Sequence, residues 1–203
     1  MNKTELIKEY DEYFTKDPAK WANKTGIKRN RFAASVITQF VNSPKRILDV
    51  GCGNGHTLNH FRRVYPDAKL YGLDISPVAC KIASDNVKRA TIASGFIEDF
   101  DMGCDFDLIL CMGVAEHFTD IEAGMRAMKR LLSKRGMLYL EIPNCLNYSP
   151  GEEGYRRLSC GSRQMEWHLS RLVWETIISQ CGFEVIQSVT GDHPAWEFVW
   201  VLR

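Results

Sequence analysis

The feature that most limits the fold of this chain is an apolar strand that leads directly into a glycine-rich loop and then a helix. Residues 47–56 read ILDVGCGNGH, with glycines at alternate positions after the strand. Glycine lets the backbone approach a ligand closely, and a helix that follows directs its first amide groups at that ligand. A dinucleotide-binding loop needs G-x-G-x-x-G, but the third glycine would fall on His56 or Leu58. The loop therefore predicts a ligand site of another kind at the start of an α/β unit.

The order of strands and helices predicts an α/β fold with a mostly parallel sheet. Between residues 45 and 142 the strand candidates are KRILDV, KLYGLDI, TIASGF, FDLILCM and GMLYLEI, and helical stretches separate them. Helices are expected near residues 4–15, 27–41, 54–64, 77–88, 119–133 and 170–181. Turn residues separate the last two strand candidates, GFEVIQSV and AWEFVWVLR, so these should pair antiparallel. The sheet is therefore expected to end in an antiparallel C-terminal strand, with helices on both faces.

Composition limits the domain organisation and the partners. The 203 residues favour a single domain, 1–203, in which residues 1–43 form an N-terminal helical cap. With 26 Lys and Arg against 25 Asp and Glu, the net charge of +1 disfavours a nucleic-acid partner. The start is polar and no apolar run is long enough to span a membrane, so we expect a cytoplasmic protein without membrane contact.

The cysteines and histidines predict neither disulfides nor a metal. The seven cysteines are odd in number and form no Cys-x-x-Cys pair, so they are expected to be reduced core residues. The five histidines show no metal-binding motif, and His56 and His60, four residues apart, are typical of a solvated helix face.

A family resemblance rests on four segments in order. Asp49-x-Gly51-x-Gly53-x-Gly55 resembles motif I of the class I S-adenosylmethionine-dependent methyltransferases, and LYGLDIS, which contains Asp74, resembles their second strand. FDLILCMGVAEHF and GMLYLEIPN are similar to the fourth and fifth strands. The resemblance covers about residues 30–203, and it implies a Rossmann-like seven-stranded sheet with S-adenosyl-L-methionine as cofactor. Without it, the glycines could serve tight turns alone.

The resemblance also implies which residues bind the cofactor. The methionine and sugar end would lie against Asp49, Gly51, Cys52, Gly53 and Gly55. Asp74 would bind the ribose, because a carboxylate can accept hydrogen bonds from both hydroxyls, with Ile75 and Ser76 beside the adenine. Carbonyl groups near the cofactor's ammonium would come from Cys111, Met112 and Gly113.

One position departs from the family pattern. Many relatives carry an acid after the third strand that reaches the adenine amine, where this chain has Phe96. Adenine would then be held by apolar contact and by backbone groups of Phe96 and Ile97.

The acceptor side offers weaker signals, each with a plain alternative. His117 is the candidate general base, because imidazole titrates near neutral pH, but Glu116 and His117 could simply begin the next helix. His168 resembles a histidine that precedes the corresponding helix in several small-molecule methyltransferases, but a structural hydrogen bond at the helix entry is the favoured alternative. Residues 144–169 are the expected acceptor-binding loop; its aromatic residues and arginines suit an anionic or ring-bearing acceptor, or else a solvated loop: Tyr148, Tyr155, Arg156, Arg157, Arg163 and Trp167. An N-terminal cluster could form a lid or simply pack: Tyr10, Tyr13, Phe14 and Trp21.

Several functions are compatible with these signals. The first is methyl transfer to an O or N atom of a small-molecule acceptor. The second is methylation of protein or nucleic acid, which the charge and the sequence Cys-Met-Gly-Val after the fourth strand, in place of an N-P-P-Y-like motif, disfavour. The third is a regulator that binds the cofactor without chemistry, and a nicotinamide dehydrogenase is the most distant. The acceptor and the oligomeric state stay open.

Overall fold

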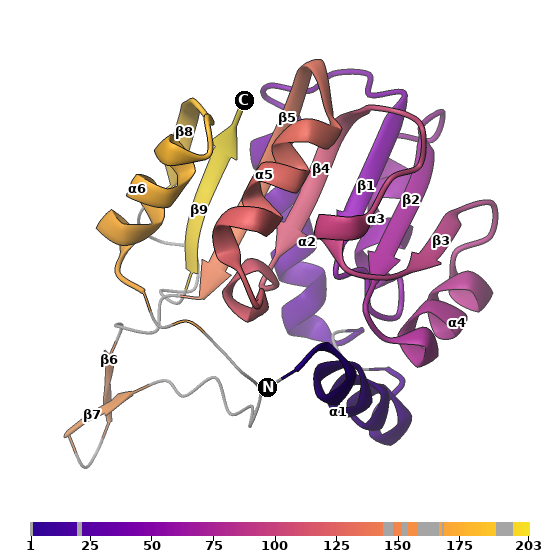
Figure 1. Cartoon of the computed structure of the whole chain (residues 1–203), viewed down its shortest axis with the longest axis horizontal. Helices are drawn as coiled ribbons and strands as arrows, with labels where there is room; N and C mark the ends of the chain where they lie inside the picture. The colour runs from indigo at the N-terminus through magenta and orange to yellow at the C-terminus, as the bar shows by residue number, and fades with distance from the viewer. Residues whose placement is uncertain are drawn as a thin grey trace.

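The computed structural model describes residues 2–19, 22–143, 148–151, 154–157, 167, 169–189 and 197–203. Within these residues seven strands form one sheet in the order β3-β2-β1-β4-β5-β9-β8 (Figure 1). Their bounds are β1 Arg46–Val50, β2 Lys69–Asp74, β3 Thr91–Ser94, β4 Phe106–Met112, β5 Leu132–Pro143, β8 Val185–Val189 and β9 Glu197–Leu202. The first five strands in this order, from β3 through β2, β1 and β4 to β5, pair in parallel. β9 runs antiparallel to both β5 and β8. The predicted sheet, with its antiparallel C-terminal strand, is confirmed.

Side-chain caps fix where most helices begin. Asn2 and Glu5 form a capping box on α1 (Lys3–Lys16), and Asn23 caps α2 (Lys24–Ile37). Ser76 caps α4 (Pro77–Asn86), Asp120 caps α5 (Ile121–Leu131) and Ser170 caps α6 (Arg171–Gln180). Helix α3 (His56–Val64) instead follows Gly55, whose φ of 80° is left-handed. All six expected helices are present, with ends that differ by a few residues.

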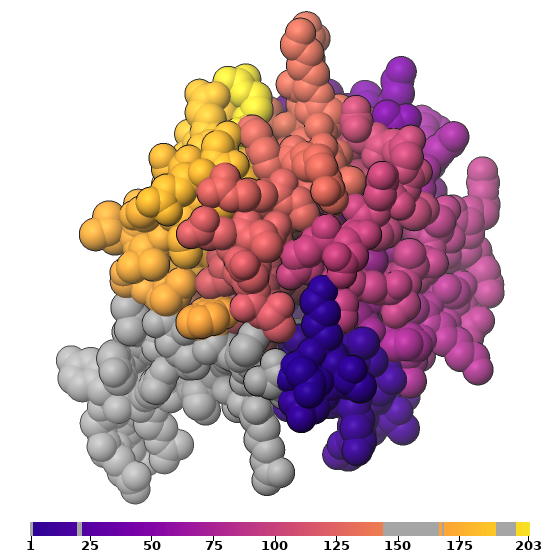
Figure 2. Space-filling model, in the orientation of Figure 1, coloured from indigo at the N-terminus to yellow at the C-terminus, as the bar shows by residue number. Residues whose placement is uncertain are grey.

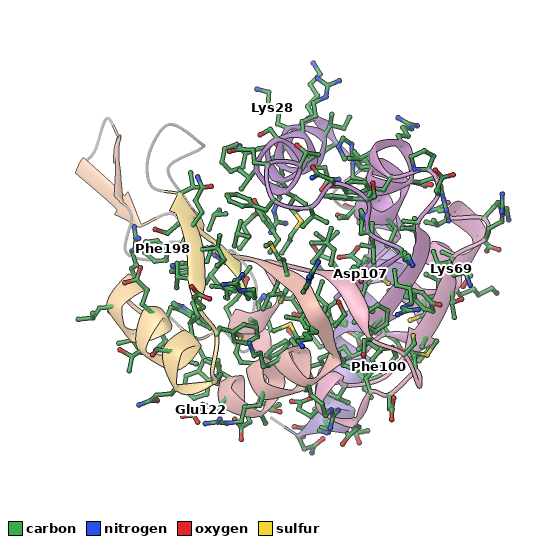
Figure 3. The ribbon with its side chains drawn as sticks, turned by 90° about the horizontal axis from the view of Figure 1, so that it is seen from above. Lys28, Lys69, Phe100, Asp107, Glu122 and Phe198 are labelled. Atoms are coloured by element: carbon green, nitrogen blue, oxygen red, sulfur yellow. The ribbon has the colours of Figure 1, made fainter. Side chains whose placement is uncertain are left out.

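Helices cover both faces of the sheet and bury two apolar cores. In Figure 3, Lys28 of α2 and Glu122 of α5 lie on opposite sides of the sheet. One core joins α5 and α6 to the sheet, with Trp174 and Trp200 fully buried. The other joins α2, α3 and α4 to the opposite face, around Phe61 and Tyr139. Because both faces are covered, the central strands read as continuous apolar runs such as FDLILCM.

Two segments differ from the sequence expectation. β5 begins at Leu132, and its pairing with β4 shifts register between Phe106 and Leu108. A Cβ at Gly136 would lie 2.5 Å from the Phe106 carbonyl oxygen, so this close approach of strands depends on glycine. Part of the expected acceptor loop forms a separate hairpin of β6 (Tyr148–Gly151) and β7 (Gly154–Arg157).

In the part of the chain that the structure describes, no helix is long and apolar enough to cross a membrane. The described cysteines, 52, 80, 104, 111 and 181, are all free.

Candidate functional site

A cavity of about 840 Å³ opens at the carboxyl ends of β1, β2, β4 and β5. This is the edge at which open α/β sheets bind ligands. Helix α1, indigo in Figure 2, lies over this end of the molecule and contributes to the lining. Most of the residues predicted from sequence line the cavity: Asp49, Gly51, Cys52, Gly53, Asp74, Ile75, Phe96, Ile97, Met112, Gly113 and His117.

Three predicted residues do not reach the lining. Cys111 is fully buried in the core. A Cβ at Gly55 would lie 2.5 Å from the Val87 side chain, so Gly55 lets α3 pack against α4. Ser76 is also fully buried, where its hydroxyl caps α4 and donates a hydrogen bond to Asp11 of α1. These three residues therefore support the elements around the cavity and do not line it.

The glycine loop is folded back on the end of β2. The amides of Gly51 and Cys52 donate to the Leu73 carbonyl at 2.7 and 3.0 Å. Gly51 and Gly53 have φ of 70° and 51°, a conformation that disfavours other residues. The ring of Phe14 packs against Gly53, and Tyr10 and Tyr13 join it on the lining. The N-terminal aromatic residues therefore both pack and close one side of the cavity.

Asp74 holds this loop and faces the cavity. Its carboxylate accepts the Gly53 amide at 2.8 Å and the Ser76 amide at 2.9 Å. Burial raises the pKa of Asp74 to about 6, and these two hydrogen bonds limit the rise.

Two further carboxylates on the lining have a buried oxygen with no hydrogen-bond partner among the described residues. Asp49, at the end of β1, is 3% exposed. Burial, with the negative charge of Asp74, raises the pKa of Asp49 to about 8, against the opposing effect of Arg29. Glu98, next to Phe96 and Ile97, was not predicted as a site residue. Such carboxylates are suited to a ligand that brings hydrogen-bond donors or positive charge.

The opposite side of the cavity is formed by the short helix η2 (Ala115–His117). Glu116 is 1% exposed, and its Oε1 lies 3.7 Å from Nε2 of His117. The amide of Trp167 donates to the Glu116 carbonyl and its indole to the Phe118 carbonyl, both at 2.8 Å. Tyr10 contacts His117 edge to face, and burial together with Glu116 raises the pKa of the Tyr10 hydroxyl.

A buried ion pair behind this wall was missed from sequence. Nε of Arg29, on α2, pairs with Oε1 of the fully buried Glu141 on β5, and the Tyr139 hydroxyl donates to Oε2 at 3.2 Å. Glu141 interrupts the apolar run GMLYLEI, and this signal could have shown that a buried charge needs a partner. No comparable signal marks Arg29, which also lines the cavity.

Several acceptor-side predictions lie outside the described residues: Trp21, His168, and the side chains of Tyr148, Tyr155, Arg156, Arg157 and Arg163. Among the residues that the structure describes, no group of three His, Cys, Asp or Glu side chains could hold a metal ion.

The fold and site define a Rossmann-like nucleoside-binding protein, and comparisons identify the family. A family model described as "Methyltransferase domain" matches residues 26–188. An amino pentose methyltransferase from Micromonospora echinaspora, solved with S-adenosylmethionine, superposes with a TM-score of 0.69 at 18% identity, over 92% of this chain and 95% of that one. Magnesium protoporphyrin IX methyltransferase from Synechocystis, solved with S-adenosylhomocysteine, gives 0.72 at 15% identity over 99% of both chains. The chain therefore belongs to the class I S-adenosylmethionine-dependent methyltransferase family.

Curated relatives match over shorter segments. A dTDP-4-amino-2,3,4,6-tetradeoxy-D-glucose N,N-dimethyltransferase from Saccharopolyspora spinosa is 36% identical over 99 residues, 47% of this chain and 39% of that enzyme. Ajmaline N-methyltransferase from Rauvolfia serpentina is 30% identical over 157 residues, 71% of this chain and 54% of its own length. The chain thus spans about half or less of the length of these relatives.

Proposed function

We propose that this protein transfers a methyl group from S-adenosylmethionine to an O or N atom of a small-molecule acceptor. The observation that carries the proposal is the cavity at the carboxyl ends of the strands, where buried carboxylates meet a glycine loop. The relatives named for an amino sugar and for ajmaline support a small acceptor by similarity. The cavity, at about 840 Å³, lies toward the upper end of the ordinary range for ligand sites.

The residues present fit this cofactor by the chemistry of their donors and acceptors. S-adenosylmethionine carries an ammonium, two ribose hydroxyls and an adenine amine, all hydrogen-bond donors. Asp49, Asp74 and Glu98 are acceptors on the lining, and two of them have a buried oxygen that lacks a partner in the described residues. We assign Asp49 to the ammonium, Asp74 to the ribose and Glu98 to the adenine amine. Glu98 would take the role of the acid that Phe96 replaces.

When bound, the cofactor supplies a methyl group carried on a sulfonium. When this methyl group is transferred, the electron pair of its bond to sulfur stays on sulfur. The chain's own contribution is to orient the two reactants and to exclude water. Val114 and Phe118 give the wall its apolar part, and Tyr10 and Phe14 close it from α1. His117 is the general base of the proposal where the acceptor must lose a proton, since it lies on the lining beside Glu116.

The proposed function is tested first by calorimetry with S-adenosylmethionine and with NAD, and then by a methyl-transfer screen. We expect binding of the first ligand only, and release of S-adenosylhomocysteine with some small acceptors. Binding of NAD instead would reject the proposal. Cofactor binding with no transfer to any small molecule, protein or nucleic acid would indicate a regulator.

Asp49→Asn should have opposite effects on stability and on cofactor binding. The pKa of Asp49 is higher in the folded protein than in the unfolded chain, where it is near 4. Asp49 therefore contributes stability below the unfolded pKa, and this contribution is lost as the pH rises through about 8. Asparagine removes the loss, so the ligand-free Tm should rise at pH 8, and more than at pH 5. Loss of a charged hydrogen bond of about 1.5–3 kcal/mol should weaken cofactor binding roughly ten- to hundredfold.

Asp107→Asn is the matched control, because Asp107 accepts the Lys45 and Arg46 amides at the other end of the sheet. It should lower the Tm and leave cofactor affinity unchanged. Thermal melts and calorimetry measure both quantities. If Asp49→Asn bound the cofactor as tightly as the wild type, Asp49 would not be the ammonium ligand.

A further inference from the structure

Helix α1, at the carboxyl ends of the strands (Figure 1), forms part of the cavity wall without belonging to either apolar core. The lining includes a series of its residues, namely Leu6, Glu9, Tyr10, Glu12, Tyr13, Phe14 and Lys16. The two side chains that α1 buries, Leu6 and Phe14, both lie on this lining, and neither packs in the cores that join the other helices to the sheet. Because few apolar contacts hold α1, it can open at a lower cost in free energy than the helices of the cores.

A polar contact of Asp11 ties α1 to the start of α4. Oδ1 of Asp11 accepts hydrogen bonds from the Ser76 hydroxyl and from the Val78 amide, the latter at 3.2 Å. The dipole of α4 favours a carboxylate at its amino end, and hydrogen bonds to a charged group are stronger than those between neutral groups. Asp11 is therefore a strong attachment for a helix that has few apolar ones.

A second polar attachment of α1 is exposed. Nζ of Lys3 pairs with Asp99 at 2.8 Å and lies 4.4 Å from the centre of the Phe96 ring. The side chains of Lys3 and Asp99 are 47% and 74% exposed, and ion pairs this exposed contribute little, because water and salt screen them. Lys3 is thus the weaker of these two attachments.

Ser76 connects the Asp11 contact to the ribose side of the cofactor site. The Ser76 amide donates to Oδ1 of Asp74 at 2.9 Å, while the Ser76 hydroxyl donates to Asp11. Burial raises the pKa of Asp74, and the negative charge of Asp11 adds to the rise, so the two carboxylates are near enough to interact. One residue therefore joins the helix over the cavity to the acid that we assign to the ribose.

We propose that Asp11 is a positioning residue, which holds α1 closed over the bound cofactor through its contact with Ser76. The inference goes beyond the proposed function, because it concerns how the cofactor is retained, whatever the acceptor is. In the closed position Phe14 packs on the glycine loop and Tyr10 lies beside His117. Opening of α1 exposes this side of the cavity, so the cofactor dissociates faster when the Asp11 contact is lost.

The experiment measures association and dissociation of S-adenosylmethionine on the full chain by surface plasmon resonance, which needs no acceptor. Asp11→Asn removes the charge and one acceptor oxygen, and it should raise the dissociation rate at least tenfold while the association rate stays equal or rises. Asp11→Glu keeps the charge and both oxygens, so it should recover part of the loss. Thermal melts without ligand show whether each variant is folded, since a lower stability alone would not change the rates of the folded protein.

Three variants separate this contact from other changes to the two helices. Asp85→Asn makes the same substitution at an exposed position of α4, and Lys8→Gln removes an exposed charge from α1. Each should change the dissociation rate less than twofold. Lys3→Met removes the weaker attachment of α1 and should raise the rate less than Asp11→Asn does.

The double variant of Asp11→Asn with Ser76→Ala tests the partner. Each single variant disrupts the same hydrogen bond, so the double variant should release the cofactor at a rate within threefold of the faster single variant. If the two effects multiplied instead, Asp11 would act by a route other than Ser76 and the inference would be wrong.

A folded Asp11→Asn protein whose dissociation rate rises less than threefold would overturn the inference. Failure of this variant to fold would overturn it too, because Asp11 would then support the fold as a whole. The proposed function would stand after either result. Failure of the wild-type protein to bind S-adenosylmethionine would overturn the proposed function as well.

Discussion

Replacing Asp74 with alanine is expected to weaken S-adenosylmethionine binding at least a hundredfold. The proposed hydrogen bonds to two ribose hydroxyls contribute roughly 1.5–3 kcal/mol each, and about 1.4 kcal/mol corresponds to a tenfold change. The variant also removes the acceptor of the Gly53 and Ser76 amides, at 2.8 and 2.9 Å, which hold the loop in place. Titration calorimetry at pH 7 measures the loss, since Asp74, with a pKa of about 6, is then mostly ionised.

Two variants make this result specific. Asp74→Asn keeps one acceptor oxygen and should give an intermediate affinity. Asp85→Ala removes an exposed acid from α4 and should leave the affinity unchanged. A melting temperature recorded without ligand shows whether each variant is folded. A folded Asp74→Ala protein with normal affinity would reject Asp74 as the ribose ligand.

Arg29→Met is expected to cause the largest loss of stability. The variant leaves the fully buried Glu141 without its ion-pair partner, and breaking a buried pair by removing one member costs about 3–5 kcal/mol. At roughly 2–4 °C per kcal/mol for a chain of this size, the Tm should fall by about 6–20 °C. Chemical denaturation gives the free energy of unfolding independently.

The double variant Arg29→Met with Glu141→Met tests the cause. Replacing both charges with apolar side chains of similar volume is often neutral, so we expect at least half of the lost stability to return. The control is Arg126→Met on α5, whose exposed pair with Glu122 should contribute less than about 1 kcal/mol. If the double variant were no more stable than Arg29→Met, the unpaired charge of Glu141 would not explain the loss.

The sequence by itself determined the sheet and the cofactor side of the candidate site. The motif around Asp49 and Asp74 is local, since Asp49 is the last residue but one of β1 and Asp74 is the last of β2, and apolar neighbours identify both strands. Parallel strands end at one edge of a sheet, so two strand ends found separately could be placed together. The pattern of the sequence also placed the helices to within a few residues, and the structure shows that they begin at local caps such as Asn23, Ser76 and Asp120.

Only the tertiary structure decided which way the side chains near these motifs face. Gly55, Ser76 and Cys111 stand next to lining residues in sequence, yet helix packing and the alternation of the strands turn them toward the core or a helix end. The pairing of Arg29 with Glu141, 112 residues apart, depends on how α2 packs on the sheet. The acidic residues of the cavity wall likewise come from several elements, namely α1, η1 (Ile97–Asp99), η2 and the strand ends. The net charge of +1 does not reveal this acidic wall, because burial and proximity in three dimensions select which charges face the ligand.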